Sequence, residues 1–310
     1  MVDLSSAITQ MAILLLVTII GFAAAKRGYL DEHVKGKLTL LLLNVTLPCM
    51  ILASAGSIDA SQMGGQIGWT FVLGIAQFFL LLVSGALCNL VLRTPRGERP
   101  LYLFMSVLTN TGFVGIPVIA ALYGDRTVLL SSVFIMAMNL LIYSVGFALI
   151  APRGTKTGQS PWKAMANPAT VASLGAIGLL LTGVRLPAVI EGTLDMVGGI
   201  TAPVAMLLVG VIVANMPLRE VATEWRLYPF IAVRQLLVPA ALFLALRPLV
   251  PDSVVLGLFV IMFAMPVGSM ASMFAGQFGR DQALPAKGTV LSTMASFAII
   301  PALVVFMGTA

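Results

Sequence analysis

The sequence predicts an all-α polytopic membrane protein: ten transmembrane helices in two inverted five-helix repeats, with broken helices 4 and 9 crossing. The first observation behind this is composition. Of 310 residues, 59% are hydrophobic and 10% are charged, and the mean hydropathy is +1.03. Because soluble domains carry about 25% charged residues, this composition excludes a soluble enzyme, a nucleic-acid binder and a disordered chain. The other two observations are the loop charges and an internal repeat.

Apolar stretches long enough to cross a bilayer recur along the whole chain. A transmembrane helix needs about 20 predominantly apolar residues. By that measure the candidate spans are approximately residues 5–25, 37–56, 66–92, 101–122, 127–151, 167–184, 190–214, 228–249, 253–277 and 285–307. The first is predicted to be a retained helix and not a signal peptide, because Lys26 and Arg27 follow it while Asp3 precedes it.

Positive charges alternate between the loops that join these spans. Odd-numbered loops hold 14 of the 18 Lys and Arg residues, whereas even-numbered loops hold three, namely Arg126, Arg185 and Arg247. Cytoplasmic loops of membrane proteins carry the excess of Lys and Arg. The sequence therefore predicts odd loops in the cytoplasm and both termini outside, in the cytoplasmic (inner or plasma) membrane.

Several features recur at an offset of 155 residues, which divides the chain into repeats 1–155 and 156–310. Thr46-Leu47-Pro48 returns as Thr201-Ala202-Pro203, and Gly28 and Gly124 return as Gly183 and Gly279. Since each half has five spans, the second half enters the membrane inverted. Inverted repeats characterise secondary transporters, whose solute sites lie at the repeat interface. Two unrelated halves with coincident prolines remain the alternative.

The fourth and ninth spans are interrupted by Gly, Pro and polar residues. The fourth contains Thr109-Asn110-Thr111-Gly112-Phe113-Val114-Gly115-Ile116-Pro117, and the ninth contains Ala264-Met265-Pro266-Val267-Gly268-Ser269-Met270-Ala271-Ser272. Non-helical backbone at this depth is tolerated only inside protein or beside a wet cavity. We expect breaks at residues 110–117 and 264–272. A pair of kinked packing helices without a ligand is the alternative.

Broken helices present free N–H groups and a positive dipole end, which favour an anion. The candidate substrate-binding residues in the two broken spans are Asn110, Thr111, Gly112, Gly115, Pro117, Pro266, Ser269 and Ser272. Further candidates on neighbouring spans are Asn139, Tyr143, Thr46 and Pro48, each of which can instead make a helix–helix hydrogen bond.

Charged residues at depth are few. Asp195 is the one plausible carboxylate for proton or sodium coupling, with an interfacial position as its alternative. Arg234 either compensates an anionic substrate or snorkels to the cytoplasmic face, and the latter is favoured. His33 is the only histidine and lies in the first loop, so we expect no enzyme, no resident cofactor and no metal site.

The stretch Asn110-x-Gly112-Phe113-x-Gly115-Ile116-Pro117, followed by Leu122-Tyr123-Gly124, resembles the fourth-helix signature of the auxin efflux carrier family. The resemblance covers nearly the whole chain and implies a fold similar to bile-acid sodium symporters. It also implies an elevator motion, and organic anions bound beside the crossing of Asn110 and the 112–117 segment with Pro266. About 15 residues separate the fifth and sixth spans, so the long regulatory loop of the plant carriers is absent. Sodium coupling does not carry over, because no acidic sodium ligand matches at the crossing.

We therefore expect a secondary transporter of small organic anions such as mono- or dicarboxylates, embedded in the lipid bilayer and without a nucleic-acid partner. A sodium or proton antiporter of similar fold, and a channel or sensor, remain alternatives, and a homodimer is left open.

Overall fold

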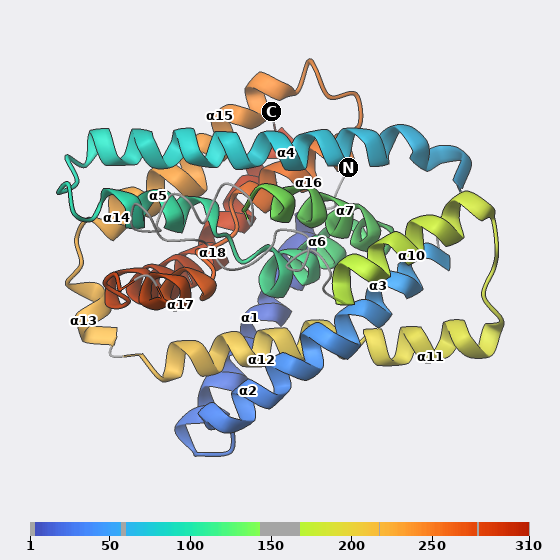
Figure 1. Ribbon diagram of the computed structural model, residues 1–310, viewed down its shortest axis with the longest axis horizontal. Coiled ribbons are helices and arrows are strands. Elements are labelled where there is room, and N and C mark those ends of the chain that lie inside the picture. The colour runs from blue at the N-terminus through green and yellow to red at the C-terminus, as the bar shows by residue number, and fades with distance from the viewer. Residues whose placement is uncertain (1–3, 57–59, 143–167, 217, 278, 310) are drawn as a thin grey trace.

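A computed structural model of the chain describes residues 4–56, 60–142, 168–216, 218–277 and 279–309, and these residues are almost entirely helical (Figure 1). The elements of the first half are α1 (Leu4–Lys26), α2 (Glu32–Leu41), η1 (Leu42–Thr46), α3 (Leu47–Gly56), α4 (Ala60–Val91), α5 (Arg99–Val107), η2 (Thr111–Gly115), α6 (Ile116–Tyr123) and α7 (Arg126–Leu141). Those of the second half are α10 (Pro168–Thr182), α11 (Ala188–Gly198), α12 (Thr201–Ala214), α13 (Leu218–Ala222), α14 (Leu227–Ile231), η4 (Ala232–Leu237), α15 (Val238–Leu246), α16 (Ser253–Phe263), α17 (Met270–Gln277) and α18 (Ala283–Thr309). The elements named η are short π-helical turns within longer helices.

Helices occupy most of the described part of each of the ten predicted apolar stretches, and the main exceptions are residues 108–110 and 264–269. Within the described residues, five helical segments are long and apolar enough to cross a membrane: Glu32–Ser54, Gly65–Val91, Ala188–Ala214, Leu227–Leu246 and Ala283–Gly308. The class of the fold, a helical polytopic membrane protein, is therefore as predicted. The count of ten crossings stays a prediction.

Glycines in the left-handed region of the backbone end four helices. They are Gly28 (φ 78°), Gly124 (φ 87°), Gly183 (φ 66°) and Gly279 (φ 64°). Each directly follows the end of its helix or lies within two residues of it, where a residue without a Cβ adopts this conformation at no steric cost. Gly28 and Gly183 are 155 residues apart, and so are Gly124 and Gly279. The offset found in the sequence thus joins residues with the same backbone conformation.

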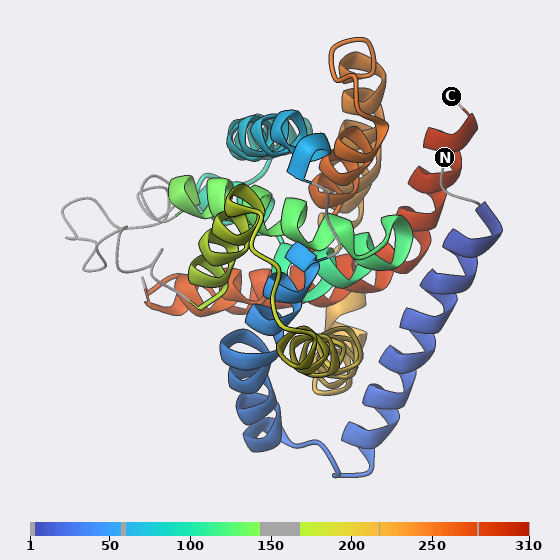
Figure 2. The ribbon, with the colours of Figure 1, turned by 90° about the vertical axis from the view of Figure 1, so that its right-hand side faces the viewer.

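The helices form two groups, each drawn from both halves of the chain. In one group α1 packs along α12, and α3 packs on α10 and α11. In the other, α4 packs on α5, α7 and α16, while α15 packs on α16 and α18 on α17. Figure 2 shows that the start of α1 and the end of α18 lie near each other, as the contact between these two helices requires.

The contact between α1 and α12 brings two continuous helices unusually close. A Cβ on Gly21 would lie 2.3 Å from the carbonyl oxygen of Leu207, and one on Gly210 would lie 2.1 Å from that of Thr18. Both neighbours are backbone atoms, so no side-chain rotation relieves the overlap. Small residues allow such approaches between membrane helices, where packing rather than hydrophobicity drives association.

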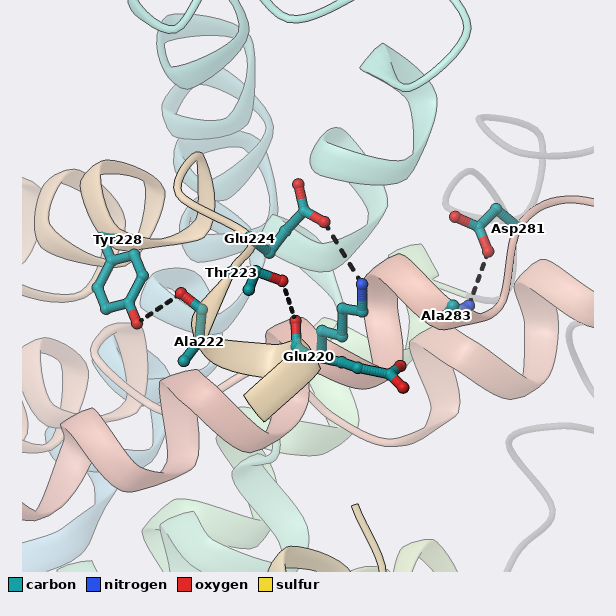
Figure 3. Close-up of polar contacts among 8 residues, drawn as sticks. Glu220, Ala222, Thr223, Glu224, Tyr228, Asp281 and Ala283 are labelled. Atoms are coloured by element: carbon teal, nitrogen blue, oxygen red, sulfur yellow. Dashed lines mark hydrogen bonds and ion pairs between the residues drawn. The ribbon is translucent and has the colours of Figure 1, made fainter. Parts of the chain in front are cut away.

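Polar side chains near the ends of helices make contacts at two ends of the molecule. At one end the amide of Asn215 donates to Glu32 over 2.7 Å, and Lys287 pairs with Glu224 over 3.5 Å. Figure 3 shows the second of these contacts with its neighbours, including the hydroxyl of Tyr228, which donates to the carbonyl of Ala222 over 3.1 Å. At the other end of the molecule, Gln66 near the start of α4 donates to Asp252, the residue before α16.

Candidate functional site

The site is the crossing of two interrupted helices, which we call the crossover. Its first break is residues 108–110, between α5 and η2, and its second break is residues 264–269, between α16 and α17. Thr109 and Val267 form an antiparallel bridge. Two main-chain hydrogen bonds flank it, from the N–H of Asn110 to the carbonyl of Pro266 (2.7 Å) and from the N–H of Gly268 to the carbonyl of Leu108 (2.8 Å). Each break thus satisfies backbone groups of the other.

The first break lies earlier in the sequence than predicted. Residues 111–117 are helical, and of the expected range 110–117 only Asn110 is outside a helix. Pro117 is the second residue of α6, which directly follows the π-helical turn η2, where the N–H of Ile116 donates to the carbonyl of Thr111. A proline inside a helix removes one backbone hydrogen bond, and a local π-helical turn accommodates that loss. The wider π-helical turn η2 then connects the break to α6. The second break falls inside its expected range of 264–272.

Gly115 allows η2, which follows the first break, to contact α16, which precedes the second break. A Cβ on Gly115 would lie 2.8 Å from the sulfur of Met262 and 3.4 Å from the side chain of Met265. Around Gly112, in contrast, no atom lies within 4 Å of a Cβ position. One face of η2 is therefore packed on α16, while Gly112 borders open space.

Side chains from three other helices hold the second break. Gln77 on α4 donates to the carbonyl of Met262 (3.3 Å), and Gln235 on η4 donates to that of Ala264 (2.9 Å). The hydroxyl of Ser292 on α18 accepts from the N–H of Val267 (2.9 Å). These groups satisfy main-chain atoms that lose helical partners at the break, as a buried backbone requires.

Arg234 donates from Nη1 to the carbonyl of Met265 over 2.5 Å, and its side chain is fully buried. Its Nε and Nη2 atoms have no hydrogen-bond partner among the described residues. The predicted snorkelling to the cytoplasmic face is therefore wrong. The reason is that a carbonyl freed by the break lies within reach of the guanidinium, which stays in the interior instead of extending to water.

The structure places most of the predicted site residues in or beside the crossover. Asn110 and Thr111 are buried there, as are Gly115, Pro117 and Pro266. Ser269 is exposed. The hydroxyl of Ser272 donates to the carbonyl of Gln282 over 2.9 Å, so its hydrogen bond goes to the turn before α18 and not to the crossover.

Among the described residues, the predicted site residues on neighbouring helices form no hydrogen bond with either break. Thr46 is buried, and its hydroxyl lies 3.4 Å from the carbonyl of Leu42 within η1, directly before Leu47 and Pro48. Asn139 lies on α7 and is partly buried. Tyr143 lies outside the described residues.

A cavity of about 620 Å³ lies between α1, α3, α11 and α12 on one side and α6 and α7 on the other, and no residue of either break lines it. Its lining includes Pro117 and Pro203, and three carboxylates, Asp125, Glu191 and Asp195. Asp195 is exposed on α11. The cavity thus joins two predicted site residues, Pro117 and Asp195, in an acidic surround.

Sequence reasoning missed Gln77, Gln235 and Ser292. A signal for them exists, because each is a polar residue within an apolar stretch, and such residues in membrane helices bond across helices or mark function. The neutral candidates all lie on the second, fourth, fifth and ninth predicted spans, whereas Gln77, Gln235 and Ser292 lie on the third, eighth and tenth. A break in a helix needs neutral donors and acceptors from every helix packed against it.

The chain matches the family model described as "Membrane transport protein" over residues 6–305. It is 21% identical over 273 residues to YfdV of Escherichia coli strain K12, named an uncharacterized transporter, with 86% of each chain covered. It is 24% identical over 214 residues to an uncharacterized transporter of Methanothermobacter thermautotrophicus, with 68% of each chain covered. Thus the chain is a multi-pass membrane transporter that belongs to the auxin efflux carrier family.

Proposed function

We propose that this protein is a secondary active transporter that moves small organic anions, such as mono- or dicarboxylates, across the cytoplasmic membrane. The substrate binds at the crossover. The single observation that carries the proposal is the pair of breaks joined by main-chain hydrogen bonds, with a fully buried arginine beside them. In secondary transporters, discontinuous helices of this kind form the substrate site.

The proposal includes an inverted repeat of five spans in each half. The glycine pairs Gly28/Gly183 and Gly124/Gly279, with their shared positive φ, support it. So does the placement of polar contacts. Residues in or beside the predicted loops 1, 7 and 9 meet at one end, and Gln66, beside the predicted loop 2, meets Asp252 of the predicted loop 8 at the opposite end. An inverted repeat of ten spans puts both termini and all even loops on one face, which the loop charges assign to the outside.

An elevator-type motion is part of the proposal. The α1–α12 pair, with α3, α10 and α11, serves as the scaffold, because close helix contacts through Gly21 and Gly210 resist sliding. The group that contains the crossover serves as the moving part. A solute at the crossover then reaches each face of the membrane in turn.

A sodium or proton antiporter of similar fold is the second candidate, and the acidic cavity favours it. Asp125, Glu191 and Asp195 line one cavity together with Pro117, and carboxylates are the usual proton and sodium relays. Ion flux in liposomes without organic solute, lost on Asp195→Asn, would support this candidate. A channel or sensor is distinguished from both by the absence of saturable counterflow.

Replacement of Asn110 by Ala tests the site. The hydrogen bonds that Asn110 makes across the crossover and into η2 use its main-chain N–H and carbonyl, and alanine keeps both. We expect the variant to fold while solute affinity falls by roughly 10- to 100-fold, the effect of a lost hydrogen bond to a charged group.

The measurement is counterflow of labelled mono- and dicarboxylates into proteoliposomes, with thermal unfolding in detergent as the check on folding. The control is Asn215→Ala, which removes only the loop contact with Glu32. Unchanged uptake in Asn110→Ala would contradict the proposed site.

A further inference from the structure

Arg234 stands out among the cations of the described residues because it is fully buried and its charge has no partner of opposite sign. The ion pairs in that part of the chain are Lys35 with Glu32 and Lys287 with Glu224, both in or near loops. The one hydrogen bond that Arg234 makes goes to a neutral carbonyl, that of Met265. Burial of a cation without a counterion costs several kcal/mol, so this position is unfavourable unless an anion joins it.

The guanidinium of Arg234 forms a hydrogen bond through one of its nitrogens and leaves one edge without a partner in the described residues. Nη1 is held by the carbonyl of Met265, within the second break, whereas Nε and Nη2 have no hydrogen-bond partner in the part of the chain that the structure describes. In a planar guanidinium the N–H bonds of Nε and Nη2 lie on one edge and run parallel. That edge matches the two oxygens of a carboxylate, which it binds through two parallel charge-assisted hydrogen bonds.

Nearby polar groups do not satisfy this edge. Gln77 and Gln235 direct their amide nitrogens to the carbonyls of Met262 and Ala264. Their carbonyl oxygens are buried and without a partner, yet neither oxygen bonds Arg234. The crossover therefore holds a positioned cation whose free edge is unused by any described part of the chain.

We infer that Arg234 is the carboxylate receptor of the crossover: Nε and Nη2 bind one ionised, planar carboxyl group of the substrate in a bidentate arrangement. This rests on the proposed function and narrows its substrate class to carboxylates. Because the guanidinium is fully buried, the carboxylate reaches it only when the crossover opens toward one face, as alternating access provides.

The test compares matched ligands on matched variants. Purified protein in detergent is titrated with unbranched monocarboxylates from acetate to octanoate, with malonate and succinate, and with the primary amide of each. The amides keep the shape and remove the charge. We expect the preferred carboxylate to bind the wild-type protein at least about tenfold more tightly than its amide, since charge-assisted bonds are about twice as strong as neutral ones.

Arg234→Lys is the decisive variant. Lysine keeps the positive charge and one donor for the carbonyl of Met265, but it lacks the two parallel N–H groups. We expect its carboxylate affinity to fall by roughly 10- to 100-fold, with amide affinity nearly unchanged. Arg185→Lys, at an exposed loop position, is the control. Arg234→Gln, which removes the charge, should abolish the preference for carboxylate over amide.

Two results would overturn the inference. One is an Arg234→Lys variant that keeps the wild-type preference, which would make the arginine a structural donor to Met265 alone. The other is wild-type protein that binds no carboxylate more tightly than its amide, a result that needs no variant to fold. The proposed function is checked separately, because counterflow of any solute by the wild-type protein would uphold transport even if Arg234 had no part in it.

Discussion

The two halves of the chain meet closely in two regions that are built in opposite ways. Where α1 meets α12, both helices are continuous, and the backbones approach through Gly21 and Gly210. At the crossover, both helices are interrupted, and non-helical backbones meet through hydrogen bonds between residues 108–110 and 266–268. The first region needs only small residues. The second needs donors and acceptors from α4, η4 and α18.

The difference follows from where the backbone hydrogen bonds go. In a continuous helix every interior N–H and carbonyl is satisfied by the helix itself, so two helices pack with no polar side chain between them. A break in the membrane interior releases these groups, and each must find another partner. An apolar contact between continuous helices and a polar contact between interrupted ones thus coexist in one fold.

The largest effect is expected from Gly210→Ala in the α1–α12 contact. The new Cβ would lie 2.1 Å from the carbonyl oxygen of Thr18 and 2.5 Å from the nitrogen of Phe22, both backbone atoms. Relief requires the helices to move apart, so we expect a loss of about 3 kcal/mol or more in the free energy of unfolding, at the upper end of overpacking costs. Thermal unfolding in detergent measures it. The matched control is Gly192→Ala on α11, where no atom lies within 4 Å, and comparable losses in the two variants would refute the argument.

An intermediate loss in the free energy of unfolding is expected from Ser292→Ala, at the second break. It removes the acceptor for the N–H of Val267, and a buried N–H without a partner costs about 1 to 3 kcal/mol. Thr109→Val, on the residue paired with Val267, should be neutral, because the hydroxyl of Thr109 is buried and has no partner to lose. Both are read by unfolding in detergent, and a greater loss in Thr109→Val would reverse the comparison between the two breaks.

The smallest effect on stability is expected within η2, from a pair of glycine replacements. In Gly115→Ala the new Cβ would lie 2.8 Å from the flexible side chain of Met262. We expect the free energy of unfolding to fall by about 1 kcal/mol. Gly112→Ala meets no atom within 4 Å and should leave stability unchanged or raise it by up to about 1 kcal/mol, the helix preference of alanine over glycine. If the open space beside Gly112 takes the solute, Gly112→Ala should nevertheless weaken solute binding, whereas unchanged binding would place the solute elsewhere.

The sequence predicted the helices well because their signals are local. Helix occupies most of the described part of each apolar stretch, with the two breaks as the main exceptions, and Gly28 and Gly183 take the same left-handed conformation at matching helix ends. The crossing of the two spans was predicted in part. Asn110 and Pro266 do meet, but the first break lies at residues 108–110, and Pro117 lies inside α6, which begins directly after the π-helical turn η2.

Arg234 shows why the remainder could not be predicted. From sequence alone a lone arginine near the end of an apolar stretch favours snorkelling, since water is the cheapest partner for its charge. The carbonyl of Met265 becomes available only because a break 31 residues further along the chain is folded against η4. The same holds for Gln77, whose acceptor on Met262 is 185 residues away.

The sequence by itself determined that this chain is a membrane protein, which residues form its helices, and which two helices are interrupted. The reason is that the length of an apolar stretch and the positions of glycine and proline act on the backbone within a few residues. Only the tertiary structure decided which side chains form hydrogen bonds with the interrupted backbone, and that the Nε–Nη2 edge of Arg234 has no partner among the described residues. Those partners are fixed by packing between distant segments, and no local pattern records them.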